Sequence, residues 1–323
     1  MNSKHALRKH QIISPGVISK KMLPNDFIKV SHPARGRVCG DGVQLAFGFW
    51  PGRGAPVIGL HGLTASHMNF VGIAERLAGR RALFAPDLRG RGDSDKPDGP
   101  YGLAQHARDV AAAMRAMDLG PSTVVGHSMG AFVATALAAQ EPSLVSSLIL
   151  IDGGYVPDST NSAAEGLNAA LALRISQLRQ TYPSRQAYRE FWRTQPHFPS
   201  GEWNSWVEDF LDYEVGGDSP VQPKASEAAV RGDMEEVLQR DAITERLRSI
   251  RVPTLLLRAE HGFVPGHPPL FSDTTVTEFR KYIPHIEDQK FVGTTHYTIV
   301  LGERAAFRIA SLIAERGSQR RSQ

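Results

Sequence analysis

The sequence predicts an α/β protein with a mostly parallel central sheet, helices on both of its faces and one helical cap insertion. Two observations indicate this fold. Short apolar segments bounded by Gly and Pro alternate with amphipathic segments up to about residue 150 and again after about residue 250. This alternation is typical of parallel strands joined by crossover helices. The stretch between these two parts has a mainly helical pattern and holds three of the four Trp residues.

The segments that we expect to form strands are short, apolar and followed by turn-forming residues, as buried parallel strands usually are. They are residues 43–49, 56–60, 82–85, 122–125, 147–151, 254–257 and 289–292. The helices expected between them have apolar residues at helical spacing. They are residues 69–77, 103–117, 131–139, 276–282 and 304–315.

These patterns divide the chain into four predicted parts. Residues 1–34 form a basic N-terminal extension, and residues 35–152 the first part of the core domain. Residues 153–247 form a helical cap, and residues 248–323 the second part of the core. Because the cap is inserted between two strands of one sheet, we expect it to cover the ends of the strands.

Charge and cysteine content exclude several classes of protein. Residues 1–40 hold eight Lys or Arg and one acid, which gives them a net charge of +7. The whole chain has a net charge of +4, so the remaining residues together carry −3. The positive charge therefore belongs to one terminal arm, and no nucleic-acid-binding module is evident. A single Cys39 excludes an internal disulfide and a cysteine zinc cluster. No apolar run could span a bilayer, and no signal-peptide pattern is present, so we expect a cytoplasmic protein.

The segment Gly126-His127-Ser128-Met129-Gly130 matches the G-x-S-x-G motif of a nucleophilic serine. It lies between a predicted strand and a predicted helix, which is the context that this motif requires. The turn would present the Ser128 hydroxyl above the sheet and place the Met129 amide at a helix N-terminus. The alternative is that Ser128 only caps that helix. We interpret Ser128 as the nucleophile.

The other groups that such a serine needs have candidates as well. His296 lies between the last predicted strand and the last predicted helix, so it is the candidate general base among twelve histidines. The loop His61-Gly62-Leu63-Thr64 directly follows a predicted strand. The backbone amides of Leu63 and Met129 are the candidate donors for the oxyanion of a tetrahedral intermediate.

Together these segments resemble the α/β-hydrolase superfamily, in its group of small capped serine esterases. The resemblance extends from about Val43 to Ile313 and includes the segment from Asp87 to Ser94, Asp-Leu-Arg-Gly-Arg-Gly-Asp-Ser. In that segment the resemblance implies a structural Asp–Arg pair with no catalytic role. It also implies hydrolysis through Ser128 and His296. The sequence has no cofactor-binding motif and no His, Asp or Glu spacing typical of a metal site, so we expect neither a cofactor nor a metal ion.

The sequence leaves more than one candidate for the acid that orients the histidine. In many members of the superfamily, an Asp follows the strand after the cap. This chain has Gly262 at the expected place, in the segment Ala259-Glu260-His261-Gly262. Asp152, at the end of the strand that follows the nucleophile strand, can take the role, as it does in haloalkane-dehalogenase-like members. We favour Asp152, with Glu260 as the alternative and Asp273 as a more remote one.

A serine nucleophile predicts acyl transfer to water, and our first expectation is hydrolysis of a carboxylic ester, lactone or thioester. The aromatic cap favours a small apolar or aromatic substrate. A polyanionic substrate would need several arginines near the pocket, but those of the cap fit a solvated helix face equally well. They are Arg174, Arg179, Arg185, Arg189 and Arg193.

Three alternatives remain: a carbon–carbon bond hydrolase, a cofactor-independent oxygenase, and a ligand receptor with residual hydrolysis. The expected partner is a small-molecule substrate, with no nucleic acid and no membrane. The sequence does not indicate the oligomeric state.

Overall fold

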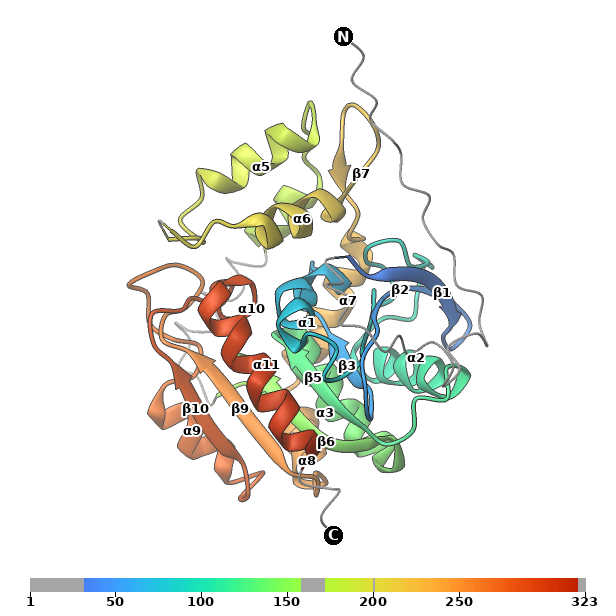
Figure 1. The fold of residues 1–323 in the computed structure, drawn as a ribbon, viewed down its shortest axis with the longest axis vertical. Coiled ribbons are helices and arrows are strands. Elements are labelled where there is room, and N and C mark those ends of the chain that lie inside the picture. Colours follow the sequence, from blue (N-terminus) through green and yellow to red (C-terminus); the bar gives the residue numbers. More distant parts are fainter. Residues whose placement is uncertain (1–31, 158–171, 200, 319–323) are drawn as a thin grey trace.

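The computed structural model describes residues 32–157, 172–199 and 201–318. Within them an eight-stranded sheet forms the centre of the molecule (Figure 1), with the strand order β1-β2-β4-β3-β5-β6-β9-β10. β1 and β2 pair antiparallel, as do β2 and β4, and all other pairs in this sheet are parallel. The strands are β1 (Ala34–Cys39), β2 (Gln44–Trp50), β3 (Val57–Leu60), β4 (Leu83–Pro86), β5 (Ser122–His127), β6 (Val145–Ile151), β9 (Thr254–Ala259) and β10 (Glu287–Phe291).

Helices cover both faces of the sheet. One face packs against α1 (Val71–Leu77), α10 (Thr298–Leu301) and α11 (Glu303–Ser318), and α11 lies in front of the strands in Figure 1. The other face packs against α2 (Leu103–Ala116), α3 (Met129–Gln140), α8 (Arg240–Arg248) and α9 (Asp273–Arg280). Two short 3₁₀ helices, η1 (His67–Phe70) and η2 (Pro142–Leu144), precede α1 and β6.

Alternation along the strands creates these two apolar layers. In β6, Leu148 and Leu150 belong to the cluster beneath α3, whereas Ile149 and Ile151 belong to the cluster beneath α11. Successive side chains of a strand point to opposite faces of its sheet. A strand buried on both faces therefore needs an unbroken apolar run, which is the pattern seen in the sequence.

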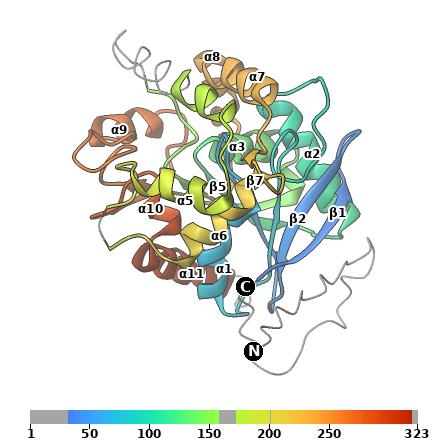
Figure 2. The same cartoon turned by 90° about the horizontal axis from the view of Figure 1, so that it is seen from above.

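The segment between β6 and β9 provides the cap. It contains a helical turn at residues 172–178, α5 (Arg185–Arg193), α6 (Ser205–Glu214), the short hairpin of β7 (Val215–Gly216) and β8 (Gln222–Pro223), and α7 (Glu227–Val237). α5, α6 and β7 lie at the top of Figure 1, and Figure 2 shows them over the end of the sheet. α8, whose residues 240–247 were assigned to the cap, packs Ile243 and Leu247 into the same cluster as α3. This helix therefore belongs to the layer beside the sheet.

The structure confirms the predicted α/β class with a mostly parallel sheet, and each predicted strand and helix corresponds to one that is observed. The sequence pattern did not predict β1 or the cap hairpin. The predicted N-terminal extension lies outside the described residues except for its last three, and Ala34 begins β1. Among the described residues, no helix is long and apolar enough to cross a membrane.

Candidate active site

Ser128 occupies a tight turn between β5 and α3. Its backbone has φ 56° and ψ −122°, a left-handed conformation that costs energy for any residue other than glycine. The two flanking glycines make the turn possible. A Cβ on Gly126 would overlap the backbone of Gly130, and a Cβ on Gly130 would overlap the carbonyl of Leu60. The strain and the close packing together present a partly exposed Ser128 side chain at the end of the sheet.

Asp152 and His296 come together at the same end of the sheet. The Nδ1 atom of His296 lies 2.7 Å from the Oδ2 atom of Asp152, and both side chains are buried. The other carboxylate oxygen, Oδ1, accepts a hydrogen bond of 3.2 Å from the amide of Ala259. An ionised carboxylate accepts only, so His296 carries a proton on Nδ1 and its Nε2 is left to act as a base.

Glu260, the alternative acid, does not lie at the histidine. Its Oε2 atom accepts a hydrogen bond of 2.9 Å from the amide of Gly293, and its Oε1 atom lies 3.2 Å from the Nζ atom of Lys290. The hydrogen bond from Gly293 and the ammonium of Lys290 lower the pKa of Glu260. Asp273, the more remote candidate, pairs with Arg258 at 2.6 Å. Of the three carboxylates considered, Asp152 is the one that contacts His296.

His127 holds the backbone of the histidine loop. Its Nδ1 atom is 3.3 Å from the side-chain Nδ2 atom of Asn69, and its Nε2 atom is 2.9 Å from the carbonyl oxygen of His296. Burial, and then the nearby His296 ring, lower the pKa of His127. A neutral ring that accepts from Asn69 must carry its proton on Nε2 and donate it to the carbonyl. His127 therefore positions His296.

The candidate oxyanion loop lies beside the serine. A Cβ on Gly62 would lie 3.3 Å from the Cβ atom of Ser128 and 3.7 Å from its Oγ atom. Within the described part of the chain, no acceptor is found for the amide of Leu63 or of Met129. His61 shapes this loop, because its Nε2 accepts from the amide of Leu88 at 2.9 Å and its Nδ1 donates to the carbonyl of Gly62 at 2.8 Å. Burial lowers the pKa of His61 to about 4, which keeps the ring neutral.

A buried ion pair braces the same loop. The Nε atom of Arg91 donates to the carbonyl of Leu63 at 2.9 Å, and its guanidinium lies 2.5 Å from Asp233 of α7. Asp233 also contacts His106 at 2.9 Å and accepts from the amide of Gly102 at 2.7 Å. Burial opposes ionisation of Asp233, but Arg91 and His106 lower its pKa to about 2. The cap segment is thereby tied to the loop that carries the Leu63 amide.

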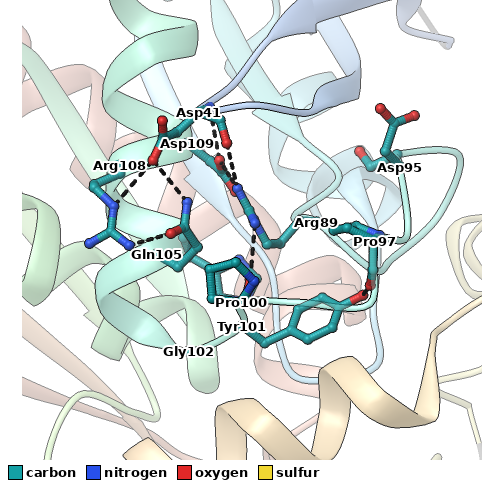
Figure 3. A network of polar contacts seen from close by, with 12 residues as sticks. Asp41, Arg89, Asp95, Pro97, Pro100, Tyr101, Gly102, Gln105, Arg108 and Asp109 are labelled. Atoms are coloured by element: carbon teal, nitrogen blue, oxygen red, sulfur yellow. Dashed lines mark hydrogen bonds and ion pairs between the residues drawn. The ribbon is translucent and has the colours of Figure 1, made fainter.

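An Asp–Arg pair holds the segment of residues 87–94, but its acid is Asp109 of α2, outside the segment, and not Asp87. Asp87 instead contacts Nδ1 of His67 at 2.9 Å and accepts from the hydroxyl of Tyr213 in α6 at 2.7 Å. Arg89 forms two hydrogen bonds of 2.5 and 2.6 Å with Asp109 of α2 (Figure 3). Asp87 also accepts from the amide of Asp93 within the segment at 3.0 Å. The side-chain partners His67, Tyr213 and Asp109 lie on other elements, so spacing within the motif could not have identified them.

A pocket lies between the cap and the oxyanion loop. Its walls include Thr64 of the loop and Arg174, Tyr188, Trp192 and Glu214 of the cap, and the space between these walls, open solvent included, is about 310 Å³. In the sequence, Arg174 is one of several arginines of the cap, and Glu214 was not expected at the site. No local signal distinguishes either residue from its neighbours on a helix. Among the described residues, no group of three His, Cys, Asp or Glu side chains has the arrangement of a metal site.

The chain is similar in sequence to a known protein family and to several of its members. The family model described as alpha/beta hydrolase fold matches residues 55–303. The chain is 30% identical to 2-(acetamidomethylene)succinate hydrolase of Mesorhizobium japonicum over 246 residues, which cover 76% of this chain and 83% of that protein. It is 34% identical to N-formylmaleamate deformylase of Pseudomonas putida over 120 residues, or 37% and 45% of the two chains. An uncharacterised protein of Mycobacterium tuberculosis is 37% identical over 110 residues, and the match spans 34% of this chain and about a third of that protein's length (32%).

Solved structures share the same fold. The crystal structure of E-2-(acetamidomethylene)succinate hydrolase has a TM-score of 0.75 at 23% identity and covers 88% of this chain and 100% of that one. A thioesterase domain from the curacin biosynthetic pathway has a TM-score of 0.67 at 21% identity and covers 86% of this chain and 98% of that one.

Proposed function

Because the chain belongs to the α/β-hydrolase fold family, we propose that it is a serine hydrolase that cleaves a carboxylic ester through an acyl-enzyme on Ser128. The observation that carries this proposal is the contact of 2.7 Å between His296 and Asp152 at the end of the sheet that also presents Ser128. A serine on a strained turn, a histidine with a free Nε2 and a buried carboxylate are the three groups that acyl transfer requires.

In the proposed mechanism, the Oγ atom of Ser128 attacks the substrate carbonyl while Nε2 of His296 accepts the serine proton. Asp152 holds the imidazole by its Nδ1–H and stabilises the imidazolium that forms. The amides of Leu63 and Met129 donate to the developing oxyanion. His296 then returns the proton to the leaving alcohol, and water attacks the acyl-enzyme by the same steps in reverse order.

The bond that is cleaved has a preferred and a second candidate. The aromatic cap, with Tyr188 and Trp192 in the pocket wall, favours a small substrate whose apolar or aromatic part packs on these rings. Lactones and thioesters fit the same chemistry. The second candidate is an amide-type bond, because one relative is named as a deformylase of N-formylmaleamate and another as a hydrolase of 2-(acetamidomethylene)succinate.

The test is hydrolysis of p-nitrophenyl esters from acetate to octanoate by the wild type and by Ser128→Ala. We expect turnover above about 1 per second for the best ester, which lies within the ordinary range of enzymes. The Ser128→Ala variant should lose at least about 10⁴-fold in kcat, because it lacks the nucleophile. An activated phosphonate should label the wild type at Ser128.

Absence of both turnover and a burst of product would contradict the proposal. The carbon–carbon bond hydrolase, the cofactor-independent oxygenase and the ligand receptor would then become the leading interpretations. A thermal shift on ligand binding with turnover at or below about one event per minute, far under the usual enzyme range, would favour the receptor.

A further inference from the structure

Arg174 differs from the other arginines of the cap in what it contacts. Arg179 pairs with Glu227 at 2.6 Å, and Arg189 and Arg193 both pair with Glu208. The guanidinium of Arg174 instead donates to the side chains of Gln177 at 2.7 Å and Thr64 at 2.6 Å, and it lies 4.9 Å from the ring centroid of Trp192. Arg185 is bound to the backbone, since it donates to the carbonyls of Asp212 and Val215 and not to side chains of the pocket.

These contacts leave the charge of Arg174 without a carboxylate partner among the described residues. Gln177, Thr64 and the Trp192 ring are all neutral, so they orient the guanidinium without neutralising it. A guanidinium has five N–H donors and stays charged in proteins. The side chain is partly buried, where a fixed positive charge is less screened by solvent than on the surface.

Glu214 lines the same pocket and also has an unused polar atom. Its side chain is buried, and its Oε1 atom has no hydrogen-bond partner among the described residues. Burial raises the pKa of Glu214 to about 8, against the opposing effect of Arg174. At neutral pH the carboxyl group is therefore protonated and can donate a hydrogen bond. A buried polar atom without a partner costs free energy that a ligand can recover.

The pocket is lined mostly by the cap and reaches the oxyanion loop at Thr64. Thr64 follows Leu63 in the oxyanion loop, and two residues of chain from Gly62 to Thr64 span at most about 7 Å. On the opposite wall, the ring centroid of Trp192 lies 5.9 Å from that of Tyr297, the residue after His296. A ligand group held by Arg174 thus lies between the loop beside Ser128 and the loop that carries His296.

We propose that Arg174 and Glu214 bind a carboxylate of the substrate, so that the ester cleaved at Ser128 carries a second, ionised carboxyl group on its acyl part. The guanidinium of Arg174 supplies charge and paired donors, and Glu214 supplies one donor, while Tyr188 and Trp192 cover the apolar stem. This inference rests on the proposed function for the reaction, but the binding site stands on its own contacts.

Binding to the Ser128→Ala variant tests this site without requiring turnover. The probes are mono-4-nitrophenyl succinate, which has a free carboxylate, and its methyl ester, which has none. We expect calorimetry to show at least tenfold tighter binding of the acid, the effect of one charge-assisted hydrogen-bonded pair. Adding Arg174→Met should reduce this preference to about threefold or less. Adding Arg179→Met, which removes a charge on the outside of the cap, should preserve it.

Other outcomes overturn the inference. These are an acid preference that survives Arg174→Met, equal affinities in the parent variant, or tighter binding of a 2-aminoethyl ester of the same acid. If Arg174→Met does not fold, as judged by its melting curve, Arg174→Gln keeps polar contacts to Thr64 and Gln177 and is expected to lose the preference equally. Failure of the wild type to hydrolyse either ester would count against the proposed function, whereas the affinities would still decide the carboxylate site.

Discussion

The two halves of the candidate site are built in different ways. The half on the core consists of Ser128, Asp152 and His296. Each of them follows a strand of the same sheet, and the carboxylate of Asp152 accepts a hydrogen bond from His296. The half on the cap consists of Arg174 and Glu214, whose charge and donor have no ionic partner among the described residues. Under the proposed function, the core supplies a reaction common to acyl substrates, and the cap selects among them.

The strongest test of this comparison replaces, one at a time, the two candidate acids Asp152 and Glu260. Asp152→Asn should lower kcat by about 10⁴-fold, because an amide in place of the carboxylate favours the wrong imidazole tautomer. Glu260→Gln should change kcat by less than about threefold, since Glu260 contacts Gly293 and Lys290 at the surface. Ester hydrolysis under saturating substrate measures both, and the reverse ranking would contradict the assignment of Asp152.

A second test measures how much the buried ion pair between Arg91 and Asp233 contributes to stability. Asp233→Asn removes the charge that pairs with Arg91 in the interior, and loss of one partner of a buried pair typically costs about 3–5 kcal/mol. We expect the free energy of unfolding in urea to fall by about that amount. The control is Glu141→Gln, which breaks the exposed pair with Arg115 and should cost less than about 1 kcal/mol. Equal effects of the two variants would show that the brace of the Leu63 loop is not important for stability.

The smallest expected effect concerns the pH dependence of the cap half. Burial raises the pKa of Glu214 to about 8, so the side chain is neutral below that pH and negative above it. Arg174, Asp87, Lys224 and Tyr188 are the titratable or charged groups that face it. Affinity of the Ser128→Ala variant for mono-4-nitrophenyl succinate should therefore fall several-fold between pH 7 and pH 9, because a second carboxylate then repels the ligand.

Glu214→Gln is the matched control for this titration. Its amide keeps a donor but does not ionise, so the affinity should remain flat over the same pH interval. A wild-type-like decline in Glu214→Gln would show that another group causes the pH dependence. The neutral methyl ester should show little dependence on pH in either protein.

The sequence predicted the core half of the site because its signals are local. Gly126 and Gly130 are required by close contacts with their own turn and with Leu60, so the residues of the motif follow directly from the geometry of the turn. His296 follows from its place after the last predicted strand. The choice between Asp152 and Glu260 stayed open, because either carboxylate ends a neighbouring strand and only the fold shows which one contacts the histidine.

The remaining features depend on partners that are distant in the sequence. Arg174 contacts Thr64, 110 residues away, and Arg91 meets Asp233 of α7, so nothing in their neighbouring residues reveals the pairing. β1 was not predicted, for another reason. Val38 is the one buried side chain of this strand, which pairs with β2 at the edge of the sheet, and one apolar residue makes no periodic pattern.

The central claim, an acyl-enzyme on Ser128 formed with the help of His296 and Asp152, is tested most directly by mass spectrometry of acid-quenched protein. Asp152→Asn should slow hydrolysis of the intermediate as well as its formation, so both this variant and the wild type are mixed with a p-nitrophenyl ester and quenched at intervals. The account predicts a mass increase equal to one acyl group, located on the peptide that contains Ser128 and absent from Ser128→Ala. Ester turnover without this adduct, or an adduct that persists in Ser128→Ala, would contradict it.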